Sequence, residues 1–146
     1  AALKARSMIG PGEIVLDAAK GKHNRVLTFK LGGKAELPPL KTAARPLDPP
    51  AATAAAERVA EGKRLYHSYC MACHGDTAVS GGMVPDLRYS ATLPSADVWK
   101  SIVLDGAMVK NGMISFARHL KADDVETLRA YIVQRAHDEK KRLANP

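Results

Sequence analysis

The clearest periodic pattern in the chain covers residues 122–142. Apolar residues recur there at helical spacing, as Val125, Leu128, Ile132 and Ala136, so one stripe of a helix would face a core. Acidic residues stand in the first turns and Lys and Arg residues gather at the end, which is the charge order that the helix dipole favours. This pattern predicts a long amphipathic helix.

Two shorter helices are predicted before it. The first begins at Thr53, a residue type that caps helices, and runs to about Tyr69 with Val59, Leu65 and Tyr66 as apolar positions. The second lies between a Ser95 cap and Gly106, which would end it. The apolar positions of this second helix are Val98, Trp99, Ile102 and Val103.

The first third of the chain has a different pattern. Apolar and polar residues alternate over Arg25–Leu31, which predicts a half-buried strand ended by Gly32 and Gly33. Five prolines fall among the 17 residues 36–52, without any apolar period, as is typical of an extended and semi-rigid linker. We therefore expect an N-terminal segment with one strand (1–35), a Pro/Ala-rich linker (36–53) and a helical domain (54–146).

Composition and charge narrow the class of protein. Apolar residues make up 46% of the chain but aromatic residues only 5%, so a cofactor is expected to fill part of the core. The net charge is +7, yet the basic residues are dispersed and no aromatics interleave them, which argues against nucleic-acid binding. No stretch approaches the ~20 consecutive apolar residues of a membrane span.

The chemistry is concentrated in the stretch CMACH. Cys70 and Cys73 are the only cysteines, and His74 follows at once. A CxxC pair can be a redox dithiol, half of a zinc site or a haem attachment site, but zinc needs about four protein ligands and a thioredoxin-like dithiol needs a βαβ unit. CxxCH is the attachment sequence of haem c: each thiol forms a thioether bond to one vinyl group, and His74 becomes the proximal iron ligand.

A second axial ligand would have to come from the opposite face of the haem. We expect Met113, because Gly112 lets the backbone approach the ring and Phe116 can pack at its edge. Other ways to fill or leave this position are Met108, His67, His119 or an open site.

Three further residues are expected to serve the cofactor. The second ring nitrogen of His74 needs an acceptor, and a backbone carbonyl in VPDLR, next to Pro85, is well placed for it. Arg88 and Trp99 are candidate partners of a haem propionate, since a buried propionate charge needs a donor.

With these residues in hand, the helical part resembles the class I cytochrome c family over residues 54–138. Besides CMACH, the spacing of Gly62, Tyr66 and Cys70 matches the family's first helix, and Leu128 with Tyr131 matches its last helix. VPDL and NGM match the proline and methionine loops. The resemblance implies an all-α cytochrome c fold with three main helices around one covalently bound haem, in which the first and last helices cross at the glycine.

A narrower resemblance concerns the front end. RVLTFKLGGKAELPP, the linker and VPDLRYS look like the C-terminal part of quinohaemoprotein alcohol dehydrogenases, which carry pyrroloquinoline quinone (PQQ) on a β-propeller. By this resemblance, residues 1–35 are a remnant of a propeller domain. The propeller with its calcium and quinone sites is absent from this sequence, so alcohol oxidation cannot be assigned to this chain by itself.

The expected function is electron transfer through a single His/Met-ligated haem c. The resemblance implies a PQQ dehydrogenase as donor, a small periplasmic carrier or the quinone pool as acceptor, and a periplasmic location. The alternative is a haem enzyme or gas-binding sensor with an open or displaceable distal ligand.

Overall fold

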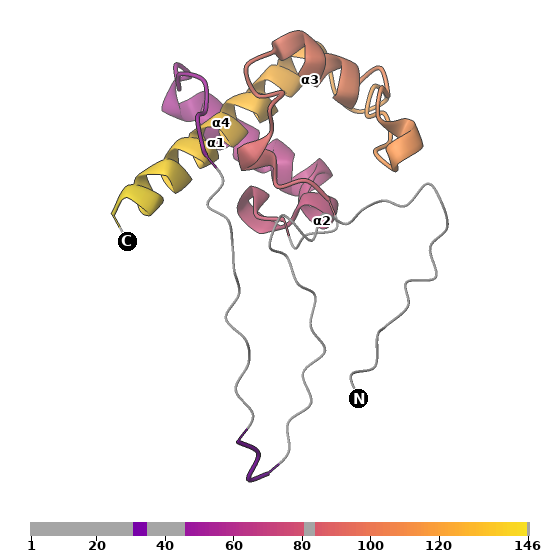
Figure 1. Cartoon of the computed structure of the whole chain (residues 1–146). Helices are drawn as coiled ribbons and strands as arrows, with labels where there is room; N and C mark the ends of the chain where they lie inside the picture. The colour runs from indigo at the N-terminus through magenta and orange to yellow at the C-terminus, as the bar shows by residue number, and fades with distance from the viewer. Residues whose placement is uncertain (1–30, 35–45, 81–83, 146) are drawn as a thin grey trace. The chain divides into compact units, whose positions relative to one another are not determined.

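Helices make up the regular structure of the described chain (Figure 1). The computed structural model describes residues 31–34, 46–80 and 84–145. The three main helices are α1 (Ala56–Tyr69), α3 (Ala96–Val103) and α4 (Ala122–Ala144). One-turn elements join them: α2 (Met71–His74), η2 (Asp76–Ala78), η3 (Leu87–Tyr89) and η4 (Val109–Asn111).

The all-α prediction is therefore confirmed for the part of the chain that the structure describes, where no strand occurs. The predicted strand Arg25–Leu31 lies outside the described residues, apart from Leu31, which is in a turn. The chain divides into two units, Ala1–Ala44 and Arg45–Pro146, and all helices of the described residues belong to the second unit. None of the described helices is both long and apolar enough to cross a bilayer.

The centre of the second unit is the crossing of α1 and α4 at Gly62 (Figure 1). A Cβ atom on Gly62 would lie 2.2 Å from the carbonyl oxygen of Thr127 and 2.8 Å from the Cβ of Tyr131, so any side chain would force the helices apart. The rings of Tyr66 and Tyr131 pack beside the crossing with centroids 5.4 Å apart. This is the crossing that the family resemblance implies.

The predicted stripe of α4 is buried, with Val125, Leu128, Ile132 and Ala136 each at most 1% exposed. It packs with side chains from α1, α3 and the connecting loops into one core. Those other core members include Tyr66, Leu93, Trp99, Val103 and Leu120.

The helix ends follow the sequence only in part. Ser95 caps α3 as predicted, since its Oγ accepts a hydrogen bond from the Val98 amide at 3.3 Å, but the helix ends at Val103, before Gly106. The prediction of Thr53 as the cap of the first helix was wrong. That helix begins at Ala56, and its N-cap Ala55 offers no side-chain hydrogen bond.

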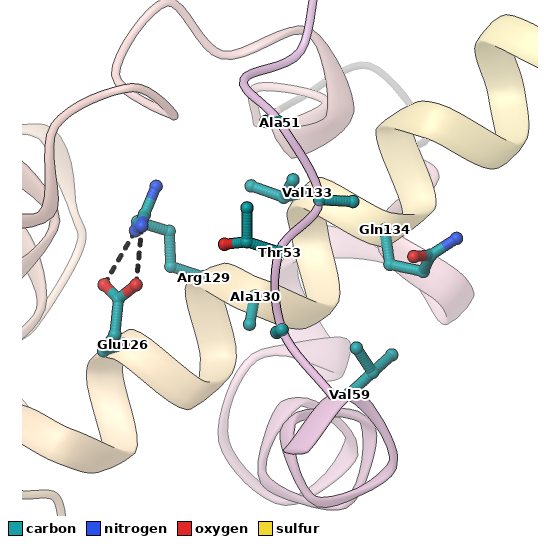
Figure 2. Close-up of a pocket in the computed structure, with 10 residues that line it drawn as sticks. Ala51, Thr53, Val59, Glu126, Arg129, Ala130, Val133 and Gln134 are labelled. Atoms are coloured by element: carbon teal, nitrogen blue, oxygen red, sulfur yellow. Dashed lines mark hydrogen bonds and ion pairs between the residues drawn. The ribbon is translucent and has the colours of Figure 1, made fainter. Parts of the chain in front are cut away.

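α1 begins later than predicted because residues 46–53, here called the strap, follow an irregular, extended path before it. Figure 2 shows Ala51 and Thr53 beside Ala130 and Val133 of α4, where they line a small hollow. Leu47 packs on the core, and Nε2 of His137 donates to the carbonyl oxygen of Pro50 at 2.8 Å. Thr53 therefore belongs to the extended strap, two residues before the N-cap of α1.

Candidate haem site

The CxxCH stretch forms a helical turn directly after α1. The amide of Cys70 donates to the Tyr66 carbonyl at 2.8 Å, and the amide of His74 donates to the Cys70 carbonyl at 2.9 Å. Cys70 and Cys73 are therefore one helical turn apart and face the same side. Both are free thiols; Cys70 is half-buried and Cys73 is exposed.

The electrostatics of Cys70 do not suit a redox dithiol. Burial, with a smaller contribution from Cys73, raises the pKa of the Cys70 thiol to about 12. Reactive dithiols need a lowered pKa, because the thiolate is the nucleophile. Nor do three or more His, Cys, Asp or Glu side chains come together as a cation site anywhere in the described ranges.

His74 is oriented by the loop that follows it. Its Nδ1 lies 3.3 Å from the carbonyl oxygen of Pro85, and because a carbonyl can only accept, Nδ1 carries the proton. Nε2 is then the atom with a lone pair to offer to a metal. The structure thus brings together His74 and Pro85, two of the residues singled out from the sequence.

A tight turn directly follows His74, before the chain continues to Pro85. Gly75 has φ +80°, and a Cβ there would lie 2.1 Å from the carbonyl oxygen of Val79, so only glycine fits. The hydroxyl of Tyr66 donates to the Gly75 carbonyl at 2.6 Å and ties the turn to α1.

Met113 lies in the loop between α3 and α4. Gly112 before it is left-handed with φ +90°, and the amide of Phe116 donates to the Val103 carbonyl at 2.8 Å, which pins the loop to the end of α3. Met113 is half-buried against the core, whereas Met108 is 38% exposed.

The two histidines considered as alternative ligands have other contacts. His67 lies with Nδ1 2.7 Å from the Lys63 carbonyl and Nε2 3.0 Å from an Asp76 carboxylate oxygen. The ring of His119 stacks on that of Tyr69, with centroids 6.1 Å apart.

Trp99 supplies a direct test of whether the site fits a haem. Its side chain is buried at 7% exposure, and its Nε1 has no hydrogen-bond partner within the described residues. A buried N–H without an acceptor is costly, and a haem propionate is an acceptor of the right kind. Half-buried apolar side chains that pack on the core offer a surface for a flat apolar group; they include Leu87, Leu104, Met113 and Phe116.

Arg88 has a role that the sequence did not reveal. It is 8% exposed, and its guanidinium pairs with Asp86 and with Glu139 of α4. Asp86 stands two residues before Arg88, so the sequence carried a local sign of this pairing. Glu139 lies 51 residues after Arg88, so no local sequence pattern predicts that these two residues pair.

Taken together, the CxxCH turn, the proline-loop carbonyl on its histidine and the crossing of the first and last helices define a c-type cytochrome domain. The chain belongs to the family described as cytochrome c oxidase, cbb3-type, subunit III, whose model matches residues 57–132.

Named relatives point to the same class of haem domain. The chain is 41% identical over 119 residues to quinohemoprotein alcohol dehydrogenase ADH IIB of Pseudomonas putida, which covers 80% of this chain and 17% of the relative. It is 41% identical over 116 residues to lupanine 17-hydroxylase [cytochrome c] of a Pseudomonas species, covering 77% of this chain and 16% of that protein.

A solved structure agrees with these relatives. The quinohemoprotein alcohol dehydrogenase ADHIIG of Pseudomonas putida HK5 matches with a TM-score of 0.61 and 38% identity, over 77% of this chain and 16% of that one. The chain thus spans about a sixth of the length of the relatives it matches. It is a cytochrome c domain homologous to the haem domains of quinohemoprotein alcohol dehydrogenases, which implies a covalent haem c and electron transfer.

Proposed function

We propose that this chain carries electrons through one haem c held by Cys70, Cys73, His74 and Met113. The observation that carries the proposal is the contact between His74 Nδ1 and the Pro85 carbonyl at 3.3 Å, because it leaves Nε2 as the ligating atom. A bound haem supplies an iron that changes between the ferric and ferrous states.

Met113 would close the distal side. Its half-buried position beside the core, and the left-handed Gly112 before it, support this role over that of the more exposed Met108. With His74 and Met113 both holding the iron, no coordination position would remain for a substrate. A methionine ligand also raises the reduction potential relative to a second histidine.

Trp99 and Arg88 are proposed to face the propionates. The unpartnered Nε1 of Trp99 supports the first assignment. Arg88 already donates to Asp86 and Glu139 through three of its nitrogens, so its contact with a propionate would have to use the N–H groups that remain.

The donor and acceptor are proposed by analogy with the named relatives. Because the matched relatives include quinohemoprotein alcohol dehydrogenases, we propose the quinone cofactor of a PQQ-dependent dehydrogenase as donor. A small periplasmic carrier or the quinone pool would accept the electrons, and the periplasm is the proposed location.

Mixing the haem-loaded ferric protein with cyanide, and separately with a small outer-sphere reductant, tests this function. A chain that only passes electrons should be reduced quickly yet bind cyanide slowly, because Met113 must leave first. Rapid uptake of cyanide or peroxide would instead indicate an open distal site, as in a haem enzyme or gas sensor.

A further inference from the structure

A cluster of buried charges links the proline loop to the last helix. We call Asp86, Arg88 and Glu139 the clamp; each is 8% exposed. Arg88 donates from Nε and Nη2 to the two carboxylate oxygens of Asp86, at 3.0 and 2.8 Å. Its Nη1 lies 3.1 Å from a carboxylate oxygen of Glu139. A planar guanidinium thus holds two carboxylates from segments far apart in sequence.

The clamp is reinforced at both ends. Asp86 also accepts from the Arg88 amide at 3.2 Å, which starts the η3 turn. Glu139 accepts from Nε and Nη2 of Arg142, at 2.8 Å each. Every charged member therefore has a partner, and this is the condition under which buried ions are tolerated.

The clamp lies next in sequence to the residue that contacts His74. Asp86 is bonded directly to Pro85, the residue whose carbonyl oxygen lies 3.3 Å from Nδ1 of His74. On the C-terminal side of Pro85, the clamp ties the loop to α4 through the ion pair of Arg88 with Glu139. α4 in turn is fixed by its crossing with α1 at Gly62.

We propose that the clamp is a positioning device for the haem ligand: by fixing Asp86 to α4, Arg88 and Glu139 hold the Pro85 carbonyl against His74 and so set the electron-donor strength of its ring. This inference rests on the proposed ligation by His74. Outer hydrogen bonds fix the tautomer and orientation of a ligating histidine and raise its basicity. Loosening the carbonyl should make His74 a weaker donor and favour the ferrous state.

The test uses the haem-loaded protein and compares Arg88→Lys with a matched control. Lysine keeps the positive charge but cannot bridge two carboxylates as the guanidinium does. The control is Glu126→Gln, because Glu126 pairs with Arg129 one turn further along α4, as Glu139 does with Arg142, but has no hydrogen bond or ion pair with residues 84–90. Glu139→Gln gives a second clamp variant of unchanged shape, which decides the test if Arg88→Lys does not fold.

The first readout is solvent exchange of the His74 Nδ1–H proton, followed by NMR in the ferrous state. Both clamp variants should exchange it about tenfold faster, the factor that corresponds to the loss of one hydrogen bond. The backbone amide of Ile132 in the core serves as reference, and its exchange should not change. Glu126→Gln should behave like the unaltered chain at both positions.

The second readout is the reduction potential, which separates positioning from simple charge. Arg88→Lys leaves the charge unchanged, so a rise in potential reports the weaker histidine. Arg88→Gln removes a positive charge, which alone would lower the potential, whereas release of the carbonyl would raise it. Unchanged exchange at His74 in both clamp variants, or a potential that only follows charge, overturns the inference.

Failure of the proposed function would be recognised separately. It would show in the unaltered protein, as rapid cyanide binding to the ferric form, before any clamp variant is compared.

Discussion

Trp99 shows how one atom can report on a missing partner. Its ring packs in the core of the domain, but its buried Nε1 finds no acceptor within the described part of the chain. Replacing it by phenylalanine keeps an aromatic ring there and removes the donor. If Nε1 holds a propionate, Trp99→Phe should lower the reduction potential, because a less compensated negative charge stabilises ferric iron. A potential unchanged in redox titration would contradict this assignment.

Glu139 gives the domain a specific response to acid. Hydrogen bonds from Arg142, opposed by burial and aided by the charge of Arg88, hold the pKa of its carboxyl below the ordinary 4.5. A carboxyl with a lowered pKa in the folded state stabilises the fold above its ordinary pKa, and this stability is lost as the pH falls. Asp86, Tyr89 and the two arginines are the other charged or titratable groups of this cluster.

We therefore expect Glu139→Gln to flatten the fall in unfolding free energy as the pH drops from about 5 towards 3. Urea unfolding of the haem-loaded protein at each pH measures this. Glu126→Gln is again the control and should keep more of the acid dependence, since Glu126 is more exposed than Glu139. Equal slopes for Glu139→Gln and the unaltered chain would show that the clamp does not carry this stability.

At the scale of the elements, Gly62 determines how closely α1 and α4 can pack. Gly62→Ala places a methyl group where the Thr127 carbonyl oxygen is only 2.2 Å away, so α1 and α4 must separate. We expect a loss of about 1–3 kcal/mol in unfolding free energy, the usual cost of overpacking, although alanine is the better helix former. Lys63→Ala, at the exposed next position, should change stability little. Similar small losses for the two variants would mean that the crossing can open without cost.

The elements also show what the sequence could predict. The stripe of α4 and the Ser95 cap were readable because they depend on neighbours three or four residues away. The start of α1 was not, because Thr53 belongs to the strap, which lies beside α4, some seventy residues later in the chain. A capping residue has its effect only where it directly precedes the first residue of the helix.

The residues of the candidate haem site also differ in whether local sequence or tertiary packing determines their contacts. Cys70, Cys73 and His74 form one contiguous motif, and its spacing carries the chemistry. The contact of His74 with Pro85 follows from a short loop, and the structure places the two together at 3.3 Å. Arg88 was singled out for a propionate, but its pairing with Glu139 depends on how α4 packs and has no local sequence signal.

For the whole molecule, the strap extends the helical unit towards the N-terminus. Residues 46–53 are the last part of the predicted linker 36–53. In this part, Leu47 packs on the core and Nζ of Lys140 lies 3.1 Å from a carboxylate oxygen of Asp48. Leu47→Ala should lower the unfolding free energy by about 1–2 kcal/mol, since a half-buried leucine contributes part of the value of a buried one. Leu143→Ala, at a side chain 49% exposed, is the matched control. Equal stability of the two variants would mean that the strap does not contribute to the folded unit.

The central claim is that one haem is held from both faces, by His74 and Met113. The most direct measurement is the weak near-infrared charge-transfer band that a methionine-ligated ferric haem shows. We predict the band in the unaltered protein and in Met108→Ala, and its loss in Met113→Ala. Absence of the band from the unaltered protein, or its loss in Met108→Ala with retention in Met113→Ala, would contradict the account.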